Sequence, residues 1–589
     1  MKKKFAVAVS ALLAASVMAG CAGGGGAGGR ARVSFLYTGD GAMGEQFALL
    51  IDAYNEGQGK EDNIQIRSAK VADDGYDTKM NTSVYDSNSY DVFCVRDEYF
   101  KKYSSFLEPL DGFEGAAELS AQVNENQLSR YRYNIQSNTS NAGDPLYAYP
   151  AVNGISVMYY NKTLLEQAGV KCISVEEKDL AAFNAGTLKD GFGKSKSDYG
   201  IEASFSVPAK GFYRETPYVK PANETNGASW QSPAKDELMI FNDKIAMNWD
   251  EAEDVGMVMT KSKNSASPTD YGYYSEWWFA YGWSVGGDCV QDISGNGDWK
   301  YTLPDATANY IVQQGTYTGV YSGKVYQKGE TLSFLDKLDV NKGDTIVAND
   351  DNTFTVNNTN VQIRAEVAQK AAAGELAELP STKEAFSRFV MLAGADGLNV
   401  CPKPSEISSA TNFFCSGRLA FCVEYMKYIS DIDKAMNQRN NQWSVAPLPV
   451  YKTYNPDGTV AVQGKSAAHS LGYGVAINKN SQMKDKAWKF VKWVAGEGQK
   501  LLAENGYLSS NIDDAALFAE KTAYPNAPVL LELNSHTQPG DWWYMPDRDW
   551  INTWSDPLNG RVRNGTMTIE EFFASYTQET NKALANYKR

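Results

Sequence analysis

Val33-Ser34-Phe35-Leu36-Tyr37, followed by Thr38-Gly39-Asp40-Gly41, is the stretch that decides the fold class. Its first five residues are mostly apolar or aromatic, as in a buried strand, and the next four contain the glycines of a turn. Beyond the turn, apolar side chains recur at the spacing of one helix face, at Phe47, Leu50, Ile51 and Tyr54. The stretch therefore predicts a strand that leads through a tight turn into an amphipathic helix.

Two further strand-like segments follow, at residues 64–66 and 90–95. Strands that alternate with amphipathic helices are typical of α/β domains with a mainly parallel sheet. Ligands of such sheets bind beyond the carboxyl ends of the strands. We therefore expect the polar side chains at these ends to contact a ligand, and they are Asp40, Arg96, Asp97 and Glu98.

The stretch Tyr271–Asp288 holds eight aromatic side chains and four glycines in eighteen residues. Aromatic rings offer flat apolar faces, while tyrosine hydroxyls, indole N–H groups and Glu276 form hydrogen bonds at the edge. This mixture suits sugars, which are apolar on one face and carry hydroxyls around it. The alternative is core packing, since Trp and Tyr are largely buried in most proteins.

The first twenty-one residues have the pattern of an export signal. Three lysines precede an apolar run over residues 5–17, and Met18-Ala19-Gly20-Cys21 provides small residues for cleavage. This ending resembles the lipobox of bacterial lipoproteins, which implies a diacylglyceryl anchor on Cys21. Residues 22–31 are rich in Gly and Ala and predict a flexible tether. A structural role for Cys21 is the alternative.

Length and charge narrow the range of functions. A chain of 589 residues exceeds a single hydrophobic core, so we expect two or more domains. The net charge of −15 disfavours nucleic acid as a partner. No apolar run after the signal is long enough to cross a membrane.

The sequence contains few residues of the types that usually bind metal ions. Only two histidines occur, His469 and His536. None of the cysteines after Cys21 lies in a Cys-x-x-Cys pair or a zinc spacing. We expect neither a metal nor a cofactor, and whether any cysteines form a disulfide stays open. The six are Cys94, Cys172, Cys289, Cys401, Cys415 and Cys422.

Several motifs in fixed order resemble one family. Tyr149-Pro150 precedes Tyr159-Tyr160-Asn161-Lys162, and a Trp-Asp-Glu helix start follows at residues 249–251. Gly286-Gly287-Asp288 ends the aromatic stretch, and Phe414–Phe421 supplies a Phe-x-x-Gly segment. Together they resemble the extracellular solute-binding proteins of sugar ABC importers, the group of the maltose-binding protein.

The resemblance implies an α/β, two-lobed periplasmic-binding-protein-like fold with a hinge. We expect lobe 1 over residues 32–151 and 466–504 and lobe 2 over residues 152–465 and 505–589. The implied function is binding of an oligosaccharide and its delivery to ABC permease subunits, without catalysis, by a lipid-anchored monomer outside the cytoplasm. The rivals are a secreted glycan hydrolase and the same fold binding a peptide or other solute.

The resemblance also implies ligand-binding residues. Lobe 2 contributes Glu276 and one or both of Trp277 and Trp278. The second wall of the cleft comes from residues near the Phe414–Phe421 segment and from a late Met-Pro segment, and comprises Glu424, Tyr425, Trp542, Trp543, Trp550 and Trp554. The alternative for Trp550 and Trp554 is burial against lobe 2. Asn153 joins the lobe 1 contacts, although it stands where the maltose-binding pattern has an acid.

Three other motifs receive structural interpretations. Asp292–Asp298 looks like the front of an EF-hand loop, but Leu303 stands at the twelfth position, so a hairpin turn is favoured over calcium. Gly282–Gly286 fits a nucleophile elbow around Ser284, but a turn follows where a helix is required. Residues 302–360 contain short β-prone runs and predict a small β-rich insertion.

Overall fold

The computed structural model describes residues 29–86, 89–349, 353–394 and 396–588. The signal segment, Cys21 and most of the tether lie outside the described residues. Within the described part, no helix is both long and apolar enough to cross a membrane.

A nine-stranded sheet runs through the molecule in the order β2-β1-β3-β22-β4-β18-β8, with β19 paired to β4 and β23 to β22. The first three strands are parallel, as predicted, because helices connect them. The strands are β1 (Ala31–Thr38), β2 (Ile64–Val71), β3 (Val92–Arg96), β4 (Ala148–Asn161), β8 (Tyr271–Tyr274), β18 (Leu419–Tyr425), β19 (Trp443–Ala446), β22 (Ala468–Ile477) and β23 (Thr537–Gln538).

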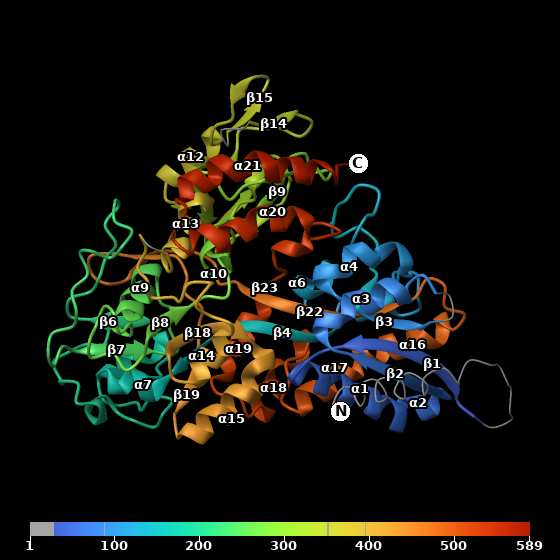
Figure 1. Cartoon of the computed structure of the whole chain (residues 1–589), viewed down its shortest axis with the longest axis horizontal. Helices are drawn as coiled ribbons and strands as arrows, with labels where there is room; N and C mark the ends of the chain where they lie inside the picture. Colours follow the sequence, from blue (N-terminus) through green and yellow to red (C-terminus); the bar gives the residue numbers. More distant parts are fainter. Residues whose placement is uncertain (1–28, 87–88, 350–352, 395, 589) are drawn as a thin grey trace, which may run out of the picture.

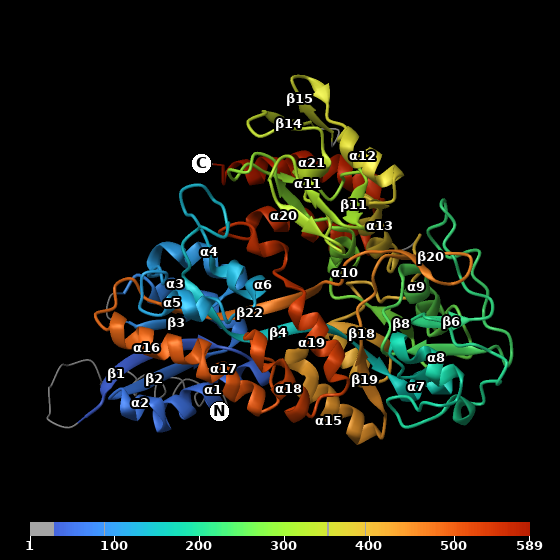
Figure 2. The ribbon, with the colours of Figure 1, turned by 180° about the vertical axis from the view of Figure 1, so that it is seen from behind.

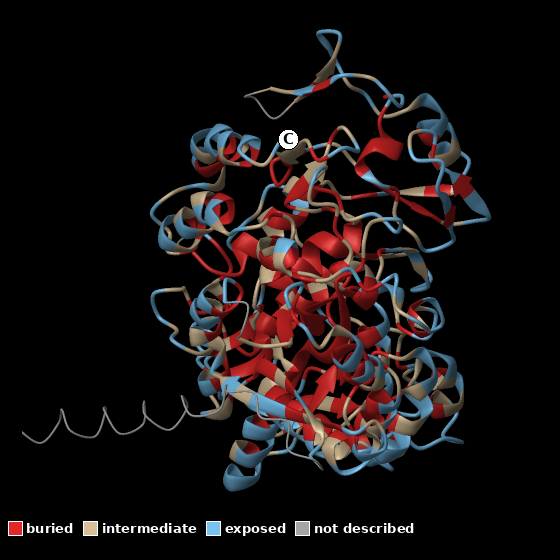
Figure 3. Cartoon of the chain, turned by 90° about the vertical axis from the view of Figure 1, so that its right-hand side faces the viewer, coloured by how far each residue is buried: buried red, intermediate tan, exposed pale blue. Residues whose placement is uncertain are grey.

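Two hydrophobic cores make the molecule two-lobed, which confirms the predicted fold class. One core takes its residues from 33–152 and 471–502, and the other from 155–468 and 503–584. The cores follow the lobes expected from the sequence, whose bounds stay a prediction. Figure 1 shows the two lobes side by side, and Figure 3, in which one lobe lies in front of the other, shows that buried segments fill the interior of the molecule.

Helices cover the sheet in lobe 1. The apolar face of α1 buries Phe47, Leu50, Ile51 and Tyr54, the residues whose spacing predicts this helix. The helices are α1 (Ala42–Glu56), α2 (Gln58–Glu61), α3 (Asp73–Ser83), α4 (Asp97–Tyr103), α5 (Ala116–Ser120), α6 (Glu125–Leu128), α16 (Lys484–Ala495) and α17 (Glu497–Glu504).

Lobe 2 is larger and contains more helices. Its helices are α7 (Lys162–Gln167), α8 (Leu180–Asn184), α9 (Trp249–Val258), α10 (Phe279–Gly282), α13 (Thr382–Met391), α14 (Ala410–Cys415), α15 (Ile429–Arg439), α18 (Ala515–Lys521), α19 (Ala527–Ser535), α20 (Asp549–Pro557) and α21 (Ile569–Ala585). Its small sheets contain β5 (Val170–Ile173), β6 (Phe212–Arg214) and β7 (Met239–Asn242), and separately β20 (Lys452–Tyr454) and β21 (Val460–Gln463).

The chain passes between the lobes three times. β4 and β22 are antiparallel neighbours, and each contributes buried residues to both cores. The third passage follows α17, from which α18 and α19 (Figure 2) lead to β23, which pairs with the first residues of β22 (Figure 1). Three adjacent backbone passages form a hinge, about which two lobes can close on a ligand.

Short strands and helices make up the region between β8 and α13. They are β9 (Val290–Asp292), β10 (Trp299–Tyr301), β11 (Asn309–Val312), β12 (Thr316–Thr318), β13 (Val325–Gln327), α11 (Phe334–Lys337), β14 (Ile346–Ala348), β15 (Phe354–Val356), β16 (Thr359–Asn360), α12 (Ala365–Ala372) and β17 (Leu376–Leu379). Two small apolar clusters of its own stabilise this insertion, and β14 and β15 form its outer tip (Figure 1).

Candidate functional site

Three chain segments meet at His469, the second residue of β22. The Nδ1 atom of His469 lies 3.0 Å from the hydroxyl of Tyr425, at the end of β18. It also lies 3.4 Å from Oε2 of Glu276, between β8 and α10. Nε2 of His469 is buried and has no hydrogen-bond partner among the described residues. The imidazole therefore joins two polar residues that the sequence predicts as ligand contacts.

Aromatic rings surround this histidine. Phe279 lies 4.6 Å from the imidazole between ring centroids and stacks on Trp283 at 4.2 Å. Trp542 meets His469 edge to face at 5.1 Å. We call Glu276, Phe279, Tyr425, His469 and Trp542 the His469 cluster. Its rings and polar atoms together match what a sugar requires.

Glu424 adds a second carboxylate beside the cluster. Burial, together with the nearby charge of Glu276, raises the pKa of Glu424 to about 7. A carboxyl group with such a pKa exchanges its proton near neutral pH, so it donates or accepts a hydrogen bond according to pH.

The lobe 1 side carries charged residues at the end of β3 and the start of α4. Glu98 forms an ion pair with Arg96 and lies 3.4 Å from Nη2 of Arg548, which comes from lobe 2. Both guanidinium groups lie 5.6 Å from the ring of Tyr99, and Arg548 lies 5.2 Å from that of Trp542. This network joins the lobes at the edge of the His469 cluster.

Two of the other predicted lobe 1 contacts form hydrogen bonds at the hinge. Asp97 is buried, lies 3.2 Å from Nη1 of Arg130 and accepts the Gly472 N–H of β22 at 3.1 Å. Asn153 donates to Oδ1 of Asn534 at 2.7 Å. Asp40 is exposed and accepts a weak 3.3 Å bond from the N–H of Asp73 within lobe 1. These hydrogen bonds go to residues outside the His469 cluster, and the contact of the three side chains with a ligand stays a prediction.

The predicted tryptophans divide into two groups. Trp277 and Trp278 both donate their indole N–H to Oδ2 of Asp541, at 2.7 and 2.9 Å. Trp550 and Trp554 are fully buried on one face of α20, and Trp554 packs 5.7 Å from Trp277. These rings pack against other side chains in this structure, as the alternative expects, with Trp277 only partly buried. Their contact with a ligand stays a prediction.

Trp542 and Trp543 lie at the boundary between the lobes. Trp543 donates to the carbonyl of Arg130 at 2.9 Å, and its ring lies 3.8 Å from Nζ of Lys101 on α4. Lys101 also donates to the carbonyl of Tyr544 at 3.0 Å. Burial lowers the pKa of this lysine to about 7. One helix of lobe 1 thus contacts the Trp-Trp segment of lobe 2 directly.

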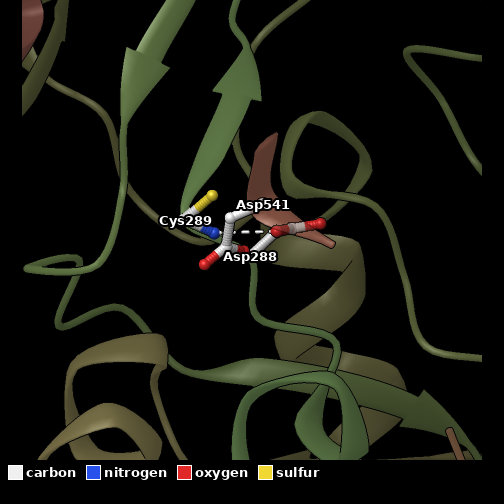
Figure 4. A group of neighbouring side chains, drawn as sticks. All are labelled: Asp288, Cys289 and Asp541. Atoms are coloured by element: carbon white, nitrogen blue, oxygen red, sulfur yellow. Dashed lines mark hydrogen bonds between the residues drawn. The ribbon is translucent and has the colours of Figure 1, made fainter. Parts of the chain in front are cut away.

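Asp288, Cys289 and Asp541 form the one group of three acid or thiol side chains in the described part of the chain whose ligand atoms lie within 4.8 Å of one another (Figure 4). Burial, together with the charge of Asp541, raises the pKa of Asp288 to about 7, and burial also raises that of Asp541. The Tyr544 hydroxyl donates to Asp288, and the two indoles occupy one oxygen of Asp541. Hydrogen-bond donors of the protein, together with protons held on the carboxyl groups, therefore satisfy most of the polar atoms of this group.

The remaining motifs have structural roles. β9 and β10 form a hairpin, as expected, and the Asp292 carboxylate accepts the backbone N–H groups of Ser294, Gly297 and Asp298. Ser284 lies buried in a short 3₁₀ turn, where its Oγ accepts the N–H of Tyr451 at 2.8 Å. The six cysteines from Cys94 onward are free.

The sequence analysis does not single out four residues of the site. Phe279 lies within the predicted aromatic stretch, and His469 precedes the recognisable strand motif that begins at Gly472. Lys101 and Arg548 reach the site only through contacts between residues more than 400 positions apart. No local pattern marks such contacts, although two Lys or Arg residues beside predicted site segments are a weak signal.

Comparisons with known proteins bear on this geometry. Residues 402–501, which include β18, β19 and β22, match the model of the bacterial extracellular solute-binding proteins. The chain has the fold of these proteins. The resemblance drawn from the sequence motifs is thereby confirmed. No curated protein matches the sequence.

Solved structures support the same fold over nearly the whole chain. The chain is 12% identical to the ABC substrate-binding protein Lmo0181 of Listeria monocytogenes, solved with cycloalternan, with a TM-score of 0.53 over 94% of this chain and 99% of that one. The cyclic α-maltosyl-1,6-maltose binding protein of Arthrobacter globiformis is 14% identical, with a TM-score of 0.53 over 95% of this chain and 100% of that one. The sugar-binding protein MalE of Xanthomonas citri is 14% identical, with a TM-score of 0.51 over 94% of this chain and 98% of that one.

Proposed function

We propose that this protein binds an oligosaccharide between its lobes and delivers it to an ABC importer. The observation that carries the proposal is the His469 cluster, which places aromatic faces and hydrogen-bonding groups together beside the hinge of a solute-binding fold. Two proteins of similar fold, one solved with cycloalternan and one named for binding cyclic α-maltosyl-1,6-maltose, support the choice of a sugar.

The lipid anchor on Cys21 belongs to the same proposal. A tethered binding protein stays near the permease that accepts its ligand, and residues 22–31 supply the tether. The proposed protein is a monomer held outside the cytoplasm by this one anchor, without a cofactor. Labelling of cells with a radioactive fatty acid tests the anchor: the wild type should carry the label, and Cys21→Ala should not.

Calorimetry against a panel of neutral oligosaccharides tests the binding. We expect one ligand per chain, recovered unchanged afterwards. Trp542→Ala should weaken binding by about 2 kcal/mol or more, because an aromatic residue at the centre of a site carries much of the affinity. Trp493→Ala, a half-buried indole on α16, is the matched control and should bind as the wild type does. Equal affinities of the two variants would refute the assignment of the site.

Glu276 and Glu424 also favour a second candidate, a glycan hydrolase. Such enzymes use two carboxyl groups, one of which has a raised pKa, as Glu424 has. This candidate predicts that the panel sugars are cleaved and that Glu424→Gln abolishes cleavage while it keeps binding. Recovery of intact sugar after long incubation with the wild type would decide for the binding protein.

A further inference from the structure

A cavity of about 770 Å³ lies outside the His469 cluster, where the insertion meets the hinge. Its wall comes from β11 to β13, from the segment that joins β21 to β22, from β23, and from Asn126 of lobe 1. Binding sites for small molecules usually measure about 300–1,000 Å³. The cavity is therefore large enough for a ligand of a few sugar units.

Positive charge is concentrated in this cavity. Lys324, Lys328 and Lys465 line it, and Glu330 is the carboxylate among its lining residues. Glu330 pairs with Lys324 at 3.0 Å, while Lys328 and Lys465 form no ion pair with a described residue. The whole chain carries a net charge of −15, so the excess of positive charge in this cavity is opposite in sign to the charge of the chain as a whole.

Lys465 is the most enclosed of the three lysines. Its backbone N–H donates to the carbonyl of Ser284 at 2.9 Å, which fixes its position just before β22. Its ammonium group has no hydrogen-bond acceptor or ion pair among the described residues. Burial lowers its pKa, and the nearby charge of Lys324 does so as well, while Asp288 and Glu330 raise it. A partly desolvated cation without a partner indicates that an anion is missing.

Uncharged polar groups complete the wall. Thr537 of β23 is 1% exposed, and its Oγ1 has no hydrogen-bond partner in the described part of the chain. The side chains of Gln313, Gln463, Ser466 and Gln538 lie around the same space. Hydroxyl and amide groups of this kind bind the several hydroxyls that a polyol carries along its carbon chain or ring.

We propose that this cavity is a second binding site, specific for an acidic sugar whose carboxylate pairs with Lys465. The site is separate from the proposed oligosaccharide site, because the cavity wall contains no member of the His469 cluster. Asn126 from lobe 1 and Lys324 from lobe 2 meet only when the lobes are close, so an occupied site favours the closed form.

Calorimetry of the full chain without its signal tests the site, with glucuronate, glucose and inorganic phosphate as probes. We expect glucuronate to bind, glucose to bind at least about tenfold more weakly, and phosphate to compete only weakly, because charge and hydroxyls are both recognised. Lys465→Met should weaken glucuronate by about tenfold or more. Rising salt should weaken it in the wild type.

Two controls separate this site from the first one. Lys500→Met, an exposed lysine on α17, should bind glucuronate as the wild type does. Tyr425→Ala should keep glucuronate binding even if it abolishes the binding of neutral oligosaccharides. Unchanged glucuronate affinity in a folded Lys465→Met variant overturns the proposal. Tight phosphate binding without glucuronate binding overturns the assignment to a sugar.

Discussion

At the scale of single residues, the site depends on which side chains meet at His469. The sequence predicts the participation of Glu276, Tyr425 and Trp542 in a site, since each belongs to a recognisable segment. It does not predict that the neighbouring indoles of Trp277 and Trp278 share one carboxylate, because Asp541 lies more than 260 positions away. The burial of an indole depends on such distant partners, so the sequence does not determine which individual tryptophans face a ligand.

Glu424→Gln should flatten the dependence of stability on pH. The folded state raises the pKa of Glu424 from 4.5 to about 7, so the folded chain binds this proton more tightly than the unfolded chain does. Stability therefore falls as pH rises through this interval, and it stays lower above it. The loss of melting temperature between about pH 5 and about pH 8 should be smaller in the variant.

The matched control for this prediction is Glu118→Gln, an exposed carboxylate on α5. Its melting temperatures should follow those of the wild type at both pH values. If Glu424→Gln loses as much stability on going to high pH as the wild type, then Glu424 does not titrate between the two states as proposed.

At the scale of elements, the local sequence predicts where a helix begins when the capping side chain lies next to the helix in the chain. Thr568 and Glu571 have the spacing of a capping box in the sequence, and this box is present at the start of α21. Ser381 and Glu384 have the same spacing, and Ser381 accepts the N–H of Glu384 at the start of α13. The pairing of β4 with β22 has no such local signal, since these strands lie more than 300 residues apart. Only the family resemblance places them together.

Trp554→Ala should act on stability and Trp542→Ala on binding. Trp554 is fully buried in α20 and packs on Trp277 and Phe386. Removal of such an indole costs about 3–5 kcal/mol, because it leaves a cavity. Trp542 is partly exposed at the lobe boundary, so its loss should cost less stability and more sugar affinity. Denaturant unfolding and calorimetry on both variants distinguish the two roles, and identical profiles would contradict the division.

At the scale of the whole molecule, closure of the lobes depends on few direct contacts. Lys101 of α4 is one of them, through Trp543 and the carbonyl of Tyr544. The cation over the indole ring is worth about 0.5–2 kcal/mol at such a site. This contact exists only when lobe 1 and lobe 2 are close, so it stabilises the closed form selectively.

Lys101→Met should shift the molecule toward the open form. Small-angle scattering should show a larger radius of gyration for the ligand-free variant than for the wild type. Sugar affinity should fall in proportion to the decrease in the fraction of molecules that are closed. Lys102→Met is the control, because Lys102 lies on the same helix but pairs with Asp77 within lobe 1 at 2.9 Å. A variant as compact as the control would show that Lys101 does not hold the lobes together.

The position of β22 between β3 and β4 has a consequence for how the chain is made. Lobe 1 cannot complete its sheet until residue 477 has been synthesised, although its first strand begins at residue 31. During most of translation, β3 and β4 thus lack the strand between them, and a fragment that ends at residue 465 should aggregate through these open edges. Late completion delays the folding of lobe 1, which suits the export that the first twenty-one residues predict.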